Sequence, residues 1–279
     1  SYDLANTKDI RDVIFKQLSS GTLSPCDDGT NNFYASLSTV GTMNSITFGK
    51  SGGVVALRGT GMQYIYGDIG FSIIIKKLTV NNSGSGVTLN VPARITSSLT
   101  LTDGIVYTTA LNLLTIGSGI SSVSGASDAS YVEGPLNKIG NQAFTFPVGK
   151  NGKLKNIGMS APSSSSAQFT AEYFKSDVSL VTGTAKEAAL DHISNCEYWT
   201  LSRVASSSNV KVTLSWTAVN CGITSLADLK VARWDVSSSR WKSGGTVSTT
   251  GNTTAGTITT SSSMSSFGQF TLGSGSSAN

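Results

Sequence analysis

His192 is the only histidine in this 279-residue chain, so it is the one imidazole that could act as a general base. It follows Asp191 and stands four residues before Cys196, and an Asp-His pair near a cysteine can activate a thiol nucleophile. No known nucleophile motif surrounds these residues, and a single histidine excludes a multi-histidine metal site. We therefore predict no catalytic residues and expect that the protein is not an enzyme.

The acidic residues also give no clear sign of a catalytic or metal site. A hydrolase or lyase acting on polysaccharides needs two converging acids, or a base with neighbouring cations and often calcium. The 16 acidic residues are dispersed, and nothing in their spacing marks two of them as partners. The most oxygen-rich loop contains Asp27 and Asp28, which are the candidate calcium ligands. It lacks the full spacing of a calcium loop and reads equally as an Asx-turn, so we favour the turn and predict no cofactor.

Large aromatic side chains could bind carbohydrate. Four tryptophans lie in the C-terminal half: Trp199, Trp216, Trp234 and Trp241. An exposed row of rings stacks on sugars, and Tyr198, Trp234 and Trp241 are the candidates for such a site. Burial in a β-sheet core is the commoner fate of tryptophan, and we favour it while keeping the sugar platform as an alternative.

The three cysteines leave one thiol over after any pairing. Cys196 and Cys221 each stand beside a strand-like run in the C-terminal half, so they could form a disulfide or remain two buried thiols. Cys26 lies in a turn with no sequence neighbour to pair with.

Short strands must position all of these residues. The phrases Leu78-Thr79-Val80, Leu99-Thr100-Leu101 and Leu114-Thr115-Ile116 repeat at intervals of 21 and 15 residues. In a strand the two apolar residues share one face and the threonine lies on the other. Strand and turn repeated in this way predict stacked rungs, and the unequal intervals predict an uneven β-solenoid.

Composition supports an all-β, extracellular protein. Only 13% of the residues are charged, Gly, Ser and Thr dominate long stretches, and the net charge of +4 comes from scattered Lys and Arg. Nucleic acid is therefore not an expected partner. No apolar run approaches the roughly 20 residues of a membrane-spanning helix, so no membrane span is expected.

Three regions are predicted. Residues 1–31 form an N-terminal segment, which reads as a short helix or a strand, with the helix slightly favoured. Residues 32–145 form the β-solenoid-like region. Closely set proline and glycines in 146–152 mark a boundary, and residues 146–279 contain short alternating runs typical of a C-terminal β-sandwich. These runs are 153–159, 167–174, 197–204, 210–217, 228–235, 240–243, 256–260 and 267–272.

Several phrases carry a family resemblance. The passages YVEGPL (131–136), FPVGKNG (146–152) and EYWTL (197–201) follow the rung-like repeats in order. This series resembles repetitive cell-surface proteins exported by the bacterial type IX secretion system. The closing FGQFTLGS (267–274) is similar to the phrase that precedes their cleaved sorting domain. The resemblance implies secretion and surface attachment or release, with a solenoid followed by a sandwich, but no particular activity.

We therefore predict a non-enzymatic, secreted, bacterial cell-surface protein that is structural or adhesive. Exposed sheet edges and the N-terminal segment make strand pairing between subunits a route to a filament. The alternative is a carbohydrate-binding module of a secreted glycan-degrading protein. The expected partners are further copies of the chain or surface glycans.

Overall fold

Alternation of apolar and polar residues produces strands along most of the chain. The computed structural model describes residues 8–10, 14–17, 26, 29–34, 36–41, 45–49, 51–67, 72–217 and 222–276. It is 51% strand and 1% helix, the helix being one short 3-10 turn, η1 (Val178–Leu180). The predicted all-β class is confirmed.

The chain divides into two compact units. The N-terminal unit comprises residues 1–139 and 152–154, and the C-terminal unit comprises residues 140–151 and 155–279. The boundary predicted between residues 145 and 146 falls inside the second unit.

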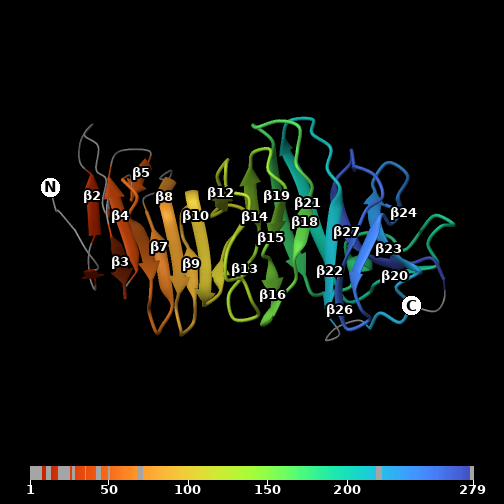
Figure 1. The fold of residues 1–279 in the computed structure, drawn as a ribbon, viewed down its shortest axis with the longest axis horizontal. Helices are drawn as coiled ribbons and strands as arrows, with labels where there is room; N and C mark the ends of the chain where they lie inside the picture. Colours follow the sequence, from red (N-terminus) through yellow and green to blue (C-terminus); the bar gives the residue numbers. More distant parts are fainter. Residues whose placement is uncertain are drawn as a thin grey trace. The chain divides into compact units, whose positions relative to one another are not determined.

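Parallel strands build the N-terminal unit (Figure 1). In order, its first sheet contains β1 (Lys8–Ile10), β3 (Thr30–Phe33), β6 (Val54–Leu57), β8 (Ser72–Asn81), β10 (Ala93–Asp103), β12 (Leu114–Ile116) and β14 (Leu136–Ile139), with β5 (Ser45–Phe48) also paired to β8. Its second sheet contains β2 (Ile14–Gln17), β4 (Leu37–Gly41), β7 (Gln63–Tyr66), β9 (Val87–Leu89), β11 (Val106–Tyr107) and β13 (Val132–Glu133). β17 (Lys153–Leu154) also belongs to this unit. Apart from β5 and β6, which both join the first sheet, the chain alternates between the two sheets, and each sheet grows in sequence order. The predicted β-solenoid-like region is therefore confirmed.

Register explains the unequal intervals between the leucine-threonine phrases. Leu78 pairs with Leu99, so the first two phrases stack directly. Leu114, in the third phrase, pairs instead with Ala93 at the start of β10. That pair is also 21 residues apart, so the third phrase begins the next rung at another position around the solenoid. The 15-residue interval is therefore not a rung length.

Aliphatic ladders fill the inside of the solenoid. Neighbouring strands place four buried residues in register: Ile73, Ala93, Leu114 and Leu136. Each occupies the apolar position of an alternating strand, so each rung covers the apolar surface of the one before it.

A polar corner connects three strands of the solenoid. The Asn82 side chain donates to the Gly61 carbonyl at 2.7 Å and to Gln63 Oε1 at 3.0 Å, and it accepts from the Gly84 amide at 2.9 Å. The neighbouring rung lies so close that a Cβ on Gly84 would be 1.8 Å from the Thr60 carbonyl oxygen. Only glycine fits this corner.

The N-terminal segment contains strands where a helix was slightly favoured. Residues 8–10 form β1, which pairs in parallel with β3, and residues 14–17 form β2, which pairs in parallel with β4. The helix was wrong at these positions, because pairing with the next rung overrides the local spacing of apolar residues.

Antiparallel strands build the C-terminal unit. One sheet contains, in order, β19 (Gln168–Phe174), β21 (Tyr198–Ala205), β27 (Gly268–Ser274), β23 (Leu229–Asp235) and β24 (Arg240–Ser243), with β20 (His192–Ile193) also paired to β27. A second contains β15 (Phe144–Phe146), β18 (Ile157–Met159), β22 (Val212–Thr217), β26 (Ala255–Thr259) and β25 (Ser248–Gly251). The short strand β16 (Gly149–Lys150) completes the described strands of this unit. Its largest fully buried side chains are Trp199, Trp216 and Trp241.

Candidate binding surface

Four outward-facing side chains form a row across the second sheet of the solenoid. Tyr64 pairs with Thr88, Thr88 with Tyr107, and Tyr107 with Glu133, so the row crosses β7, β9, β11 and β13. The residues that alternate with them are buried: Gln63, Ile65, Val87, Leu89, Val106 and Val132. We call Tyr64, Thr88, Tyr107 and Glu133 the tyrosine row. With strands about 4.8 Å apart, it is about 14 Å long.

Tyr66 widens one end of this row. Its side chain is 38% exposed and stacks on Tyr64, with ring centroids 5.2 Å apart and planes inclined by 27°. The Thr88 hydroxyl contacts the Met62 sulfur at 3.3 Å. The row therefore offers two adjacent rings at one end and a third ring two strands away.

Electrostatics at the other end come from Glu133. Burial, followed by the negative charge of Glu133, raises the pKa of Tyr107 above its ordinary value. Burial is also the main reason that the pKa of Tyr131 rises to about 12, and the Tyr131 hydroxyl donates to Glu133 Oε2 at 3.4 Å. Both phenols keep their protons at neutral pH, but Tyr131 is fully buried, so Tyr107 is the phenol that this end presents beside the Glu133 carboxylate.

Flat rings, hydroxyl groups and a carboxylate are the groups that bind sugars and polyols. Ring faces stack on the apolar face of a pyranose, while hydroxyls and carboxylates bond to its hydroxyl groups. The row was missed from sequence, although Tyr64 and Tyr66 flank Ile65 in an alternating strand. Its other members lie 24, 43 and 69 residues after Tyr64, and only the register brings them together.

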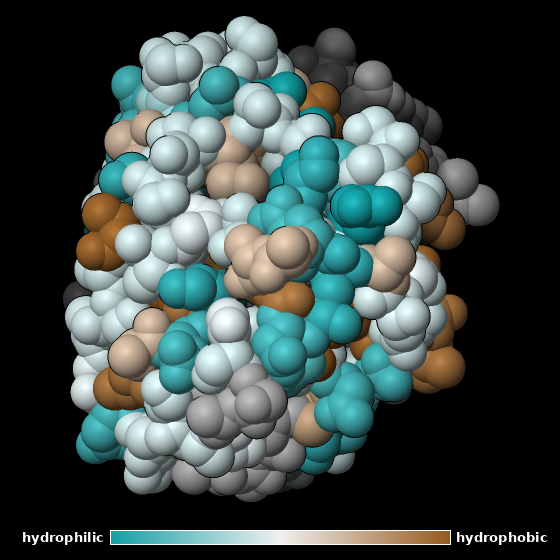
Figure 2. Space-filling view, turned by 90° about the vertical axis from the view of Figure 1, so that its right-hand side faces the viewer, coloured by the Kyte–Doolittle hydropathy of each residue, from teal (hydrophilic) through white to brown (hydrophobic). Residues whose placement is uncertain are grey.

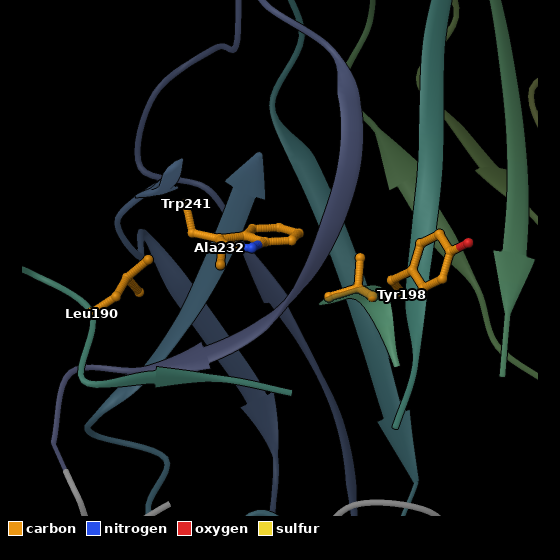
Figure 3. Close-up of a cluster of buried hydrophobic side chains, with 5 residues drawn as sticks. Leu190, Tyr198, Ala232 and Trp241 are labelled. Carbon is orange, nitrogen blue, oxygen red and sulfur yellow. The ribbon is translucent and has the colours of Figure 1, made fainter. Parts of the chain in front are cut away.

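Of the three predicted carbohydrate residues, two lie in the hydrophobic core and the third packs against it. Tyr198 and Trp241 are buried in a cluster with Val178, Leu190 and Ala232 (Figure 3). Trp234 packs against this cluster, with its ring centroid 5.6 Å from that of Trp241. The Trp241 indole donates to the Gly183 carbonyl at 2.9 Å. The three side chains do not form an exposed row.

Figure 2 shows one face of the molecule coloured by hydropathy. Hydrophilic and near-neutral residues cover most of the face shown there, and hydrophobic residues are scattered over it. The exposed large apolar side chains described in the C-terminal unit are Leu180, Val181, Val204, Val236 and Val247, all aliphatic.

His192 and Cys196 share the wall of one cavity of about 270 Å³. His192 Nδ1 lies 3.0 Å from Asp191 Oδ2, so the predicted Asp-His contact is present. Cys196 is disulfide-bonded, however, and its sulfur is not a thiol nucleophile. Its predicted partner Cys221 lies outside the described residues.

The candidate calcium ligands Asp27 and Asp28 also lie outside the described residues. Among the residues that are described, no three His, Cys, Asp or Glu side chains gather as a potential metal site. In the same part of the chain, no helix has the length and apolar character needed to cross a membrane.

Comparison with known proteins returned no match to a family model, a curated protein or a solved structure.

Proposed function

We propose that this chain is a secreted, non-enzymatic protein of the bacterial cell surface, with a structural or adhesive role. The observation that carries the proposal is the stack of parallel rungs, which ends among the described strands at β1 and β2. The last strand of a sheet presents backbone groups that can pair with another strand. The resemblance to proteins exported by the type IX system supports the secreted location.

Pairing of β1 and β2 with a different sheet edge of the next copy, such as β24, would join copies into a filament. Electron microscopy of the purified full chain tests this, with Phe15→Pro as the disrupting variant, because proline removes a ladder donor from β2. Thr249→Pro, in the edge strand β25 of the C-terminal unit, is the matched control. We expect filaments from the native chain and the control but not from Phe15→Pro. Filaments from all three proteins would exclude this mode of assembly.

We also propose that the two antiparallel sheets of the C-terminal unit pack as a β-sandwich. The Trp199 indole, on β21, donates to the carbonyl of Lys155, which leads into β18 of the other sheet, at 2.9 Å. A crystal structure with water between the two sheets would refute this arrangement.

Carbohydrate binding is the second candidate function, and the tyrosine row favours it. A glycan array of the full chain tests it, followed by titration of any bound glycan against Tyr64→Ala and Tyr107→Ala. Tyr34→Ala is the control, because Tyr34 is also 38% exposed and lies outside the row. We expect each row variant to weaken binding about tenfold or more, on the order of one lost stacking contact, and the control to bind normally. Equal glycan binding by all variants would show that the tyrosine row is not the binding site.

A further inference from the structure

A lysine and a glutamate meet inside the C-terminal unit. Lys155 leads into β18 and Glu197 immediately precedes β21. Lys155 Nζ lies 2.9 Å from Glu197 Oε2 and 3.2 Å from Oε1. The two side chains are 0% and 2% exposed. The nitrogen therefore contacts both oxygens of the carboxyl group.

Three neighbours hold this pair in place. The Tyr173 hydroxyl donates to Glu197 Oε2 at 2.7 Å, and Tyr173 is itself buried. The Trp199 indole donates to the Lys155 carbonyl at 2.9 Å, and the Thr271 hydroxyl donates to the Glu197 carbonyl at 2.7 Å. Both main-chain positions and one carboxylate oxygen are thus fixed by buried hydrogen bonds.

Burial changes the chemistry open to the pair. Removing two charges from water is costly, and apolar residues of similar size are often as stabilising as a buried ion pair. Attack of the nitrogen on the carboxyl group requires the neutral amine and the neutral acid, which one proton transfer along the 2.9 Å contact would produce. A neutral amine is a nucleophile, and fixed groups about 3–3.5 Å apart react far faster than the same groups in solution.

We propose that Lys155 and Glu197 condense to an intramolecular amide bond. Nζ attacks Glu197 Cδ, the new C–N bond forms, and the bond from Cδ to one carboxyl oxygen breaks. That oxygen leaves as water with the acid proton and one amine proton, so no oxidant or reductant takes part. The Tyr173 hydroxyl stabilises the negative charge that develops on Oε2 during the attack.

The amide would link residues 42 positions apart. It would resist thiol reductants, unlike a disulfide, and would hold the start of β21 to the segment before β18.

Intact-mass measurement of the purified full chain, with its cysteines reduced, tests the proposal. We expect a mass lower than that of the sequence by one water molecule, and a branched proteolytic peptide containing Lys155 and Glu197. A protein with the full sequence mass and two separate peptides overturns the proposal and leaves a simple ion pair. This measurement needs no variant, so it does not depend on how a substitution folds.

Two variants test the roles of the groups. Lys155→Arg keeps the positive charge but lacks a nucleophilic amine, so the full sequence mass is expected; water loss in this variant would place the link elsewhere. Tyr173→Phe keeps both reacting groups, and we expect the linked fraction to form about a hundredfold more slowly after refolding from an unlinked, denatured precursor. Unchanged kinetics would overturn the role assigned to Tyr173.

Discussion

The two units of this molecule differ in where their tyrosines and tryptophans lie. The N-terminal unit packs aliphatic ladders between parallel rungs and leaves Tyr64, Tyr66 and Tyr107 at least partly exposed on one sheet. The C-terminal unit packs tryptophans between antiparallel strands, and the large apolar side chains it exposes are aliphatic. Three tyrosines therefore lie on one face of the first unit, which buries Phe33, Phe48 and Tyr131, whereas the second unit buries three of its four tryptophans.

The largest expected effect is loss of the aromatic core of the C-terminal unit. Trp199 is fully buried and its indole is hydrogen-bonded, so Trp199→Ala is expected to cost about 3–5 kcal/mol. All four tryptophans lie in this unit, so denaturation followed by tryptophan fluorescence reports on it alone. Trp234→Ala, at a partly exposed position, should cost less. Equal losses for both variants would contradict the assignment of Trp199 to the core.

The next effect concerns a lysine inside the solenoid. Lys138, on β14, pairs with the buried Ile116 of the neighbouring strand β12 and is itself fully buried. Its amine donates to the Gly117 carbonyl at 3.0 Å and to the Ile139 carbonyl. Burial lowers its pKa from 10.5 to about 8. Between these values the unfolded chain binds more protons, so stability should rise with pH across pH 8 to 10.5 by up to about 3 kcal/mol.

Lys138→Met removes this titration. Unfolding of the N-terminal unit, followed by circular dichroism, should gain stability over that pH range in the native chain and gain less in the variant. The tryptophan transition of the C-terminal unit, measured in the same samples, is the internal control. Identical pH profiles for the two proteins would show that burial does not shift the Lys138 pKa.

A smaller effect is expected at the corners of the rungs. Gly84→Ala places a methyl group against the Thr60 carbonyl and should cost about 1–3 kcal/mol, because the next rung must move. Gly61→Ala is the matched control, since nothing lies within 4 Å of a Cβ at that position. Thermal unfolding of the N-terminal unit checks the pair. A control as destabilised as Gly84→Ala would mean that backbone freedom, not rung spacing, requires the glycines.

The smallest effect is expected near a turn of the C-terminal unit. Hydrogen bonds from Lys242 and then Ser238 hold the pKa of Asp235 well below its ordinary value of 3.8. Its ionised form therefore stabilises the fold above about pH 4, and this contribution is lost as the pH falls below that value. Asp235→Asn should lower the thermal midpoint slightly at pH 7 and flatten its fall in acid. If the thermal midpoint of Asp235→Asn falls in acid as steeply as that of the native chain, Asp235 does not contribute to the acid sensitivity.

The positions of most strands were predictable from sequence. The runs predicted at 167–174, 197–204 and 228–235 match β19, β21 and β23 to within one residue at each end. Alternation and turn residues act over a few positions, so they are visible in a single chain. The predicted N-terminal helix was wrong because parallel pairing with a later rung, which is not a local interaction, outweighs the helical spacing of the apolar residues.

By itself, the sequence determined that this chain forms short strands, stacks them as rungs in its first half, and keeps its tryptophans in the second. Only the tertiary structure decided which rings face solvent and which charged groups meet inside. The tyrosine row depends on register across four strands, and the contact of Lys155 with Glu197 joins residues 42 positions apart. Register and long-range packing minimise the free energy of the whole unit, and no local pattern encodes them.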